Sequence, residues 1–218
     1  MKLFVVAFLG VGLAVLAGLW LDRRLPHQRG RDPGVEANAR LIGYASIVLL
    51  IPLAAEVGTG IRLGLLAHAL IGFLLLPPLL LKLGSVGYRF VRYYTGDAGY
   101  RLAGPPEIVM RLLGPALVLL TLALFVTGIE LWLFGFRFGS QWAVWHKAAF
   151  VLWFLAVTVH VVAYWRRASE LALADSRIRL KGAMARRSLV IASLILGASL
   201  LIAMLPFPSP FTLLPGSS

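Results

Sequence analysis

Cysteine is absent from this 218-residue chain, and acidic residues are scarce, with nine of them against 21 lysines and arginines. The absence of cysteine excludes disulfides, cysteine-ligated iron–sulfur clusters, thioether-attached haem and thiolate zinc sites. Charged residues make up only 14% of the chain, hydrophobic residues make up 60%, and the mean hydropathy is +0.87. Because soluble domains are about 25% charged, this composition excludes a soluble enzyme, a disordered chain and a fibre, and it indicates an integral membrane protein.

Six apolar stretches are long enough to cross a bilayer as helices, which takes about 20 residues each. They cover about 3–21, 41–58, 61–81, 108–134, 141–165 and 187–206. Gly58-Thr59-Gly60 predicts a tight turn between the second and third stretches. Pro77-Pro78 predicts that the third helix kinks or ends near its far end.

The first stretch resembles a signal peptide, because Met1-Lys2 precedes an apolar run. No small-x-small cleavage site comes before the charged cluster that begins at Asp22. We therefore interpret the stretch as a retained helix, which brings the number of spans to six.

The basic residues predict the orientation in the membrane. Seventeen of the 21 lie in the segments 22–40, 82–111 and 166–187, all on one side of a six-span chain. The positive-inside rule makes that side cytoplasmic and places both termini outside. Since the charge serves topology, we do not expect nucleic-acid binding, and we expect a multi-pass protein of an inner (cytoplasmic) membrane.

Three of the four histidines lie inside predicted spans. His68 is on the third span, whereas His146 and His160 are on the fifth, and His27 lies in a cytoplasmic loop. An ionisable side chain within a span is costly and marks a candidate functional site, although a single histidine there can also serve as an interhelical hydrogen-bond donor. His146 and His160 are 14 residues apart, so they share a helix face and differ in depth by about 21 Å.

Depth selects which histidines can share one metal ion. His68 and His146 lie about 10 and 8 Å from the outer surface by helix rise, whereas His160 lies near 28 Å. Two axial ligands on opposite faces of a haem must lie at one depth. His68 and His146 meet this condition, and His68 and His160 do not.

Glycines surround His68 at intervals of four residues, in the run Gly60-x3-Gly64-x3-His68-x3-Gly72. Residues four apart share a helix face, so the face of His68 is otherwise bare and leaves room for a flat macrocycle against Gly64 and Gly72. Packing of small residues between membrane helices is the alternative explanation of the pattern.

These residues resemble the bacterial membrane cytochrome b superfamily, which includes the cytochrome b subunits of nickel–iron hydrogenases and formate dehydrogenases. The residues that carry the resemblance are His68-x3-Gly72 within 61–83, and Trp145-His146-Lys147 through His160. The resemblance implies a four-helix bundle that binds b-type haem between its helices. His68 and His146 would be the axial ligands of the haem iron.

The resemblance covers residues 40–166 and divides the chain into three parts. Residues 1–39 would form the first transmembrane helix and a cytoplasmic loop, and 40–166 would form the four-helix cytochrome b core. Residues 167–218 would form a cytoplasmic loop, the last transmembrane helix and an external tail. The expected fold is therefore an all-α haem-binding bundle with one extra transmembrane helix at each end.

One departure from the family concerns His160. The family has a histidine near the cytoplasmic end of the first bundle helix, but residues 40–46 contain none. Three readings remain: the inner haem is lost, an unusual ligand such as Tyr44 or His27 replaces the missing histidine, or a partner subunit supplies it. We favour the first reading and expect one haem b, while a second haem at His160 stays open.

Charged residues near the outer surface provide candidates for two further roles. Arg62, Arg137 and Lys147 suit haem propionates, because charge-assisted hydrogen bonds to carboxylates are strong. Glu56 and Glu130 could exchange protons with a quinone, or they could pair with the nearby arginines.

The expected function is that of an electron-transfer subunit of an oxidoreductase complex rather than of a stand-alone enzyme. It would pass electrons between an external, periplasmic redox subunit and the membrane quinone pool, and the uncharged tail 207–218 would help to hold that partner. The alternatives are a non-haem assembly or scaffold subunit, whose histidines bond helices together, and a small transporter.

Overall fold

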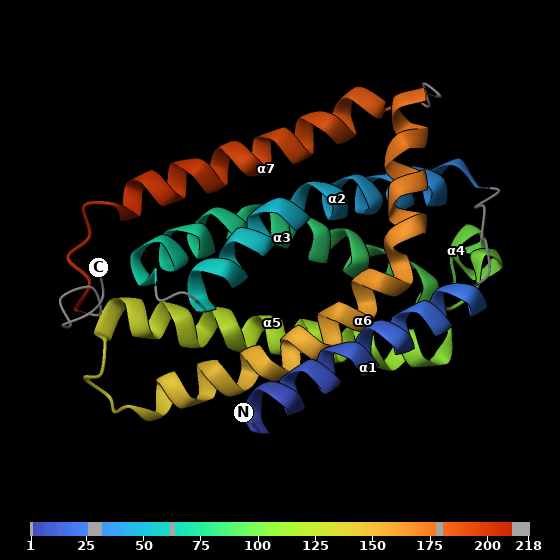
Figure 1. Cartoon of the computed structure of the whole chain (residues 1–218). Helices are drawn as coiled ribbons and strands as arrows, with labels where there is room; N and C mark the ends of the chain where they lie inside the picture. Colours follow the sequence, from blue (N-terminus) through green and yellow to red (C-terminus); the bar gives the residue numbers. More distant parts are fainter. Residues whose placement is uncertain (1, 26–31, 62–63, 178–180, 211–218) are drawn as a thin grey trace.

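The computed structural model describes residues 2–25, 32–61, 64–177 and 181–210, and this part of the chain contains helices and no strands. The helices are α1 (Lys2–Arg24), α2 (Pro33–Ile61), α3 (Leu65–Tyr94), α4 (Ala98–Ala103), α5 (Ile108–Phe134), α6 (Gln141–Arg177) and α7 (Ala183–Met204) (Figure 1). All of them except α4 are long and apolar enough to cross a membrane. The prediction of an all-α, six-span membrane protein is therefore confirmed.

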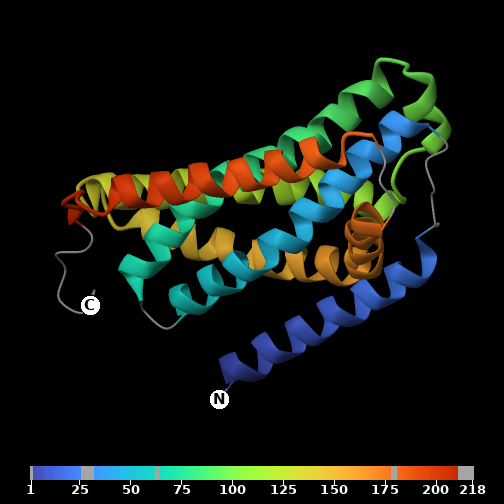
Figure 2. The same cartoon turned by 90° about the horizontal axis from the view of Figure 1, so that it is seen from above.

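The long helices form a core of four with one further helix on either side (Figures 1 and 2). Within the core, α2 packs along both α3 and α6, and α5 packs along α6. The first helix, α1, lies against α6, and the last helix, α7, lies against α3. By contrast, the backbone of α3 lies close to that of α5 over a short stretch only, and it does not pack closely along α6. Side chains therefore span the interior between α3 and α6.

Glycines set how closely the outer helices approach the core. A Cβ atom on Gly18 of α1 would lie 2.6 Å from Cβ of Val162, and one on Gly197 of α7 would collide with the carbonyl oxygen of Leu74. Small residues at such contacts let membrane helices pack backbone to backbone. A glycine also lets α2 pack closely against α6, because a Cβ on Gly43 would lie 2.7 Å from Cβ of Leu171.

The predicted turn at Gly58-Thr59-Gly60 is wrong, because α2 continues through these residues to Ile61. Thr59 Oγ1 donates to the carbonyl oxygen of Ala55 at 2.8 Å, a hydrogen bond within the helix. Glycine is common in membrane helices and does not by itself end one. Residues 62–63 lie outside the described residues, and α3 begins at Leu65.

The proline pair does not end α3, which continues through Pro77 and Pro78 to Tyr94. The fourth span agrees with its prediction, since α5 covers 108–134. The helices α2 and α6 extend beyond their apolar runs into the basic segments. In α2, an ion pair of 2.6 Å between Arg40 Nη2 and Glu36 Oε1 stabilises this extension.

The three basic segments lie at one end of the molecule, on the right in Figure 1, which we call the inner end. Two helices, α4 and α5, begin at this end, and a carboxylate caps the N-terminus of each. Asp97 accepts a hydrogen bond from the backbone N–H of Tyr100 at the start of α4, and Glu107 accepts one from Val109 at the start of α5. We call the opposite end, where α3 and α6 begin, the outer end.

Candidate metal centre

Two histidines face each other across the core near the outer end. His68 lies in the first turn of α3, His146 lies in the second turn of α6, and their ring centroids are 6.1 Å apart with the ring planes at 84°. A metal–nitrogen bond is about 2 Å long and a ring nitrogen lies about 1 Å from the ring centroid, so imidazoles on opposite sides of one metal ion have centroids about 6 Å apart. The observed centroid separation is close to this value.

A threonine of α5 fixes the protonation of His146. Thr127 Oγ1 donates its single proton to the carbonyl oxygen of Ala123 at 2.6 Å and lies 2.8 Å from His146 Nδ1. Because a hydroxyl has one proton to donate, Thr127 must accept from His146. The Nδ1 atom of His146 therefore carries the proton, and Nε2 keeps its lone pair.

The end of α2 fixes His68 in the same way. His68 Nδ1 lies 3.0 Å from the carbonyl oxygen of Glu56 and 3.2 Å from Oε1 of the same residue. A carbonyl oxygen can only accept, so Nδ1 of His68 donates and its Nε2 also keeps a lone pair. This arrangement is typical of metal-ligating histidines, whose second ring nitrogen donates to a carbonyl or carboxylate.

Each imidazole also lies against a glycine of the preceding long helix in the chain. A Cβ atom on Gly60 of α2 would lie 3.0 Å from Cε1 of His68, and a Cβ on Gly128 of α5 would lie 3.3 Å from Cε1 of His146. Neither Nε2 atom has a hydrogen-bond partner among the described residues. The two rings are therefore held at one edge and free at the nitrogen that binds metal.

A second hydrogen bond between α5 and α6 keeps His146 in register. Trp153 Nε1 donates to Thr121 Oγ1 at 3.0 Å, and both groups are buried. Trp153 lies two turns further along α6 than His146, and Thr121 lies a similar distance back along α5 from Thr127. The two pairs together fix how α5 and α6 slide past each other.

The ligand count limits which metal the site fits. In the described part of the chain, no three His, Cys, Asp or Glu side chains gather to hold a metal ion. A bare zinc ion takes three or four protein ligands, so two imidazoles are too few for it. They suit a metal whose equatorial positions are already filled, as in haem.

The remaining residues of the predicted pocket have other surroundings. A Cβ atom on Gly72 would lie 3.3 Å from Oε1 of Glu56, and Gly64 precedes α3 and faces Thr59. The helix face near His68 is thus occupied by Glu56 rather than bare, because the longer α2 carries that side chain past Gly72. Lys147 is exposed, and Arg62 lies outside the described residues.

His160 has a different neighbour from any that the sequence predicted. Its ring lies 5.0 Å from the ring of Tyr164, and Lys82 of α3 lies within electrostatic range of it. The residue next to Tyr44, Gly43, packs on Ala168 and Leu171, about 12 Å or more along α6 from His160. Within the described residues, Tyr44 makes no hydrogen bond or ring contact with His160, and His27 lies outside them.

Sequence reasoning missed Lys82 and Thr127. The signal for Lys82 is its spacing from His68, which is 14 residues and equals the spacing of His160 from His146. Because α3 and the first part of α6 both run from the outer to the inner end, before the last part of α6 turns across that end (Figure 1), equal spacings give similar depths. No comparable signal exists for Thr127, since the sequence does not give the rotation of α5 about its axis.

Further buried polar atoms lie towards the outer ends of α2 and α5. Both carboxylate oxygens of Glu130, Oε2 of Glu56 and Nε1 of Trp132 are buried without a hydrogen-bond partner within the described residues. The expected pairing of Glu130 with Arg137 is not formed there; Arg137 is exposed and lies over the ring of Phe138. The alternative partner of Glu56, Arg62, is outside the described residues, whereas His68 contacts it directly.

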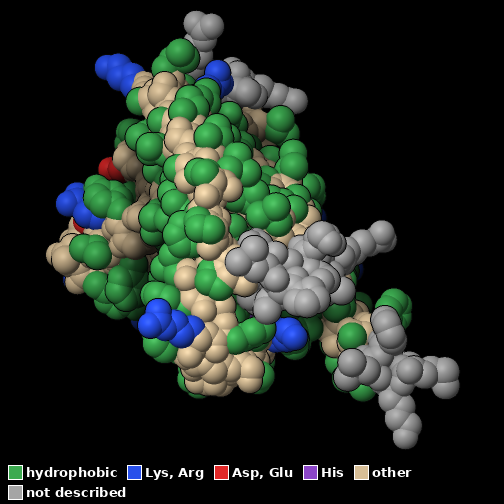
Figure 3. All heavy atoms as spheres, turned by 90° about the vertical axis from the view of Figure 1, so that its left-hand side faces the viewer, with side chains coloured by type: hydrophobic (Ala, Val, Ile, Leu, Met, Phe, Trp, Pro, Cys, Tyr) green, Lys and Arg blue, Asp and Glu red, His purple; other side chains and the backbone are tan. Residues whose placement is uncertain are grey.

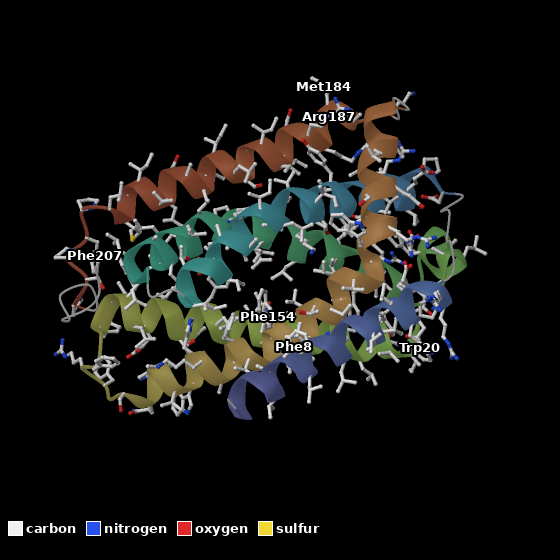
Figure 4. All side chains as sticks on the ribbon, viewed as in Figure 1. Phe8, Trp20, Phe154, Met184, Arg187 and Phe207 are labelled. Carbon is white, nitrogen blue, oxygen red and sulfur yellow. The ribbon has the colours of Figure 1, made fainter. Side chains whose placement is uncertain are left out.

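The start of the C-terminal tail packs back onto α5. The Phe207 ring lies 6.1 Å from the ring of Trp132, and Ser209 Oγ donates to the carbonyl oxygen of Trp132 at 2.5 Å. Figure 4 labels Phe207 at the outer end of the molecule. This part of the predicted docking tail therefore contacts its own chain, while residues 211–218 lie outside the described residues.

Comparisons of the chain with protein-family models, with curated proteins and with solved structures found no match. The geometry of the two histidines is therefore the basis on which a function can be assigned.

Proposed function

We propose that the protein is a membrane-anchored b-type cytochrome subunit, in which His68 and His146 hold the iron of one haem b. The observation that supports this most directly is the pair of imidazoles 6.1 Å apart with both Nδ1 protons already donated. When bound, haem supplies one-electron redox chemistry. Electrons would pass between an external redox partner and the quinone pool of the membrane.

The chain's own residues perform three tasks in this proposal. Thr127 and Glu56 orient the two rings and keep the protons on Nδ1, which raises the basicity of Nε2. The helices α2 and α5 hold these acceptors beside the ligand-bearing helices α3 and α6. His68 and His146 are both partly buried, and burial is one of the protein's means of setting a haem potential.

The position of the histidines favours an external partner. Both lie in the first two turns of helices that begin at the outer end, so the inner surface is about 20 Å further away. Figure 3 looks onto the outer end, where hydrophobic side chains cover much of the face and Lys and Arg side chains stand singly. Exposed Phe134, Phe136 and Phe138 belong to this end. Such a surface suits docking to another subunit.

An absorption spectrum of the purified protein tests the proposal. We expect the bands of a six-coordinate low-spin b haem that is reducible by a quinol analogue. A protein purified from haem-replete cells without these bands would contradict the proposal and leave the scaffold or transporter alternatives. His68→Ala and His146→Ala, purified in parallel, distinguish haem held by these ligands from adventitious haem, which both variants would retain.

A further inference from the structure

Five polar side chains converge between α3 and α6 at the inner end of the core, and we call them the inner basic cluster. They are Lys82 and Arg89 of α3 and His160, Tyr164 and Arg167 of α6. On each helix their spacings of seven, four and three residues place them on one face. Each of the five is partly buried rather than exposed.

Electrostatic contacts link the members across the two helices. Lys82 lies within electrostatic range of His160, whose ring contacts that of Tyr164. Tyr164 in turn lies within range of both Arg89 and Arg167. The cluster therefore extends continuously along the space between α3 and α6.

The cluster has more cationic than anionic groups. The carboxylates within range of Tyr164 and Arg167 are Glu107 and Glu170, and Glu107 already caps the start of α5 through the N–H groups of Val109 and Met110. Arg89 also lies within range of Tyr100, which Asp97 influences in turn. No member of the cluster makes a hydrogen bond or an ion pair with another residue in the described part of the chain. Burying charges without ion-pair partners is costly, and Lys82, Arg89 and Arg167 outnumber these two carboxylates, so an anionic occupant would stabilise the arrangement.

Neighbouring arginines on the same helices behave differently. Arg92 of α3 and Arg166 of α6 are exposed, and each pairs with a carboxylate, Asp97 and Asp22 respectively. Arg89 and Arg167 are partly buried instead, lie within electrostatic range of each other and have no such partner among the described residues. The difference indicates a site rather than a general surplus of surface charge.

The depth of the cluster identifies the chemistry of its ligand. Lys82 and His160 lie about 21 Å further in than His68 and His146, and Arg89 lies about 10 Å beyond Lys82. The last part of α6 turns across the inner end of the molecule instead of continuing inwards (Figure 1). This range covers the inner membrane interface, where lipid phosphates lie. Basic pockets between helices on the cytoplasmic side bind phosphorylated headgroups, and arginine binds phosphate through two parallel hydrogen bonds.

We propose that the inner basic cluster binds the phosphate of an anionic phospholipid, with Arg89 and Arg167 contacting the phosphate oxygens and Tyr164 donating a further hydrogen bond. Lys82 would contact the deeper side of the headgroup. This site is separate from the proposed haem site, and neither assignment depends on the other.

Native mass spectrometry of the full-length protein, titrated with phosphatidylglycerol or phosphatidylcholine of the same chain length, tests this proposal. We expect the first phosphatidylglycerol to bind at least tenfold more tightly than the first phosphatidylcholine. Arg89→Gln and Arg167→Gln should each weaken phosphatidylglycerol binding about tenfold, since each removes a charge-assisted hydrogen bond. Arg167→Lys keeps the charge, so it should lose less affinity for phosphatidylglycerol than Arg167→Gln. It also provides a second variant if the glutamine variant fails to fold.

Arg92→Gln and Arg166→Gln are the matched controls, because each removes the same charge from the exposed side of the same helix. An equal loss in these controls would overturn the proposal, as would equal affinity for the two lipids. A parallel titration with inorganic phosphate distinguishes the sources of the ligand. Binding of inorganic phosphate alone, with the same loss in Arg167→Gln, would assign the site to a soluble phosphate compound and overturn the lipid assignment.

Discussion

The outer and inner halves of α3 and α6 carry the same spacing but different chemistry. Fourteen residues separate His68 from Lys82, and 14 separate His146 from His160, so two nitrogen-bearing pairs lie between the same helices at two depths. In the outer pair, Glu56 and Thr127 from the neighbouring helices accept the Nδ1 protons. In the inner pair, the surroundings are cationic. In the two proposals, the acceptors on α2 and α5, rather than α3 and α6 alone, would distinguish a metal site from an anion site.

The largest effect should come from removing one of the outer histidines. We expect His68→Ala and His146→Ala each to abolish the low-spin haem spectrum, because each removes one of the two axial ligands. His160→Ala is the matched control on the same helix face as His146, and its haem content should stay unchanged. A six-coordinate low-spin spectrum in either outer variant would refute the assignment of the ligands.

A smaller effect should follow from removing an acceptor while keeping the ligand. Thr127→Val preserves the shape of the side chain but leaves His146 Nδ1–H without its acceptor, and we expect haem to be retained about 10- to 100-fold more weakly. Haem transfer to apomyoglobin measures this change. Thr121→Val is the control, since it breaks the other buried hydrogen bond between α5 and α6. Equal haem loss in both variants would mean that Thr127 acts only through helix packing.

The carboxylate beside His68 should tune the potential of the site. We expect Glu56→Gln to raise the midpoint potential at a pH where Glu56 is ionised, because the carboxylate near Nδ1 would stabilise the more positive oxidised iron. A shift of about 60 mV would correspond to a tenfold change in the relative stability of the two redox states. Glu36→Gln, at the inner end, should leave the potential unchanged in a spectroelectrochemical titration. An unchanged potential in Glu56→Gln would contradict this role.

The smallest effect should follow from changing the inner pair. We expect the wild type to contain one haem per chain by pyridine haemochrome assay, and Lys82→Met to contain the same amount with the same spectrum. A ratio near two that falls to one in Lys82→Met would instead make Lys82 and His160 the ligands of a second haem.

The sequence predicts the number and approximate position of the spans because hydropathy depends on composition alone. It also predicts that His68 and His146 lie at similar depths, since helix rise is constant. The predicted end of the second span was wrong because a glycine pair often marks a turn in soluble proteins but is tolerated within a membrane helix. The inner ends of α2 and α6 extend further than apolar runs indicate, since ion pairs such as Arg40–Glu36 continue the helix into polar surroundings.

The partners of the histidines could not be predicted from the sequence. Whether Thr127 meets His146 depends on how α5 is rotated and how far it slides along α6, and the close approach at Gly128 and the Trp153–Thr121 hydrogen bond set both. The contact of Glu56 with His68 depends on where α2 ends, because this position sets which residues of α2 and α3 lie side by side. The predicted turn placed that end too early in the chain. Lys82 could have been found from its spacing, had its segment been treated as part of a span.

The most direct test of the central claim is electron paramagnetic resonance of the oxidised, purified wild-type protein, with the ferric signal quantified against protein. Two imidazoles at 84° to each other predict a strongly anisotropic low-spin signal that accounts for one iron per chain. A high-spin signal from five-coordinate iron, or the absence of any haem signal, would contradict the proposal that His68 and His146 hold a haem between them.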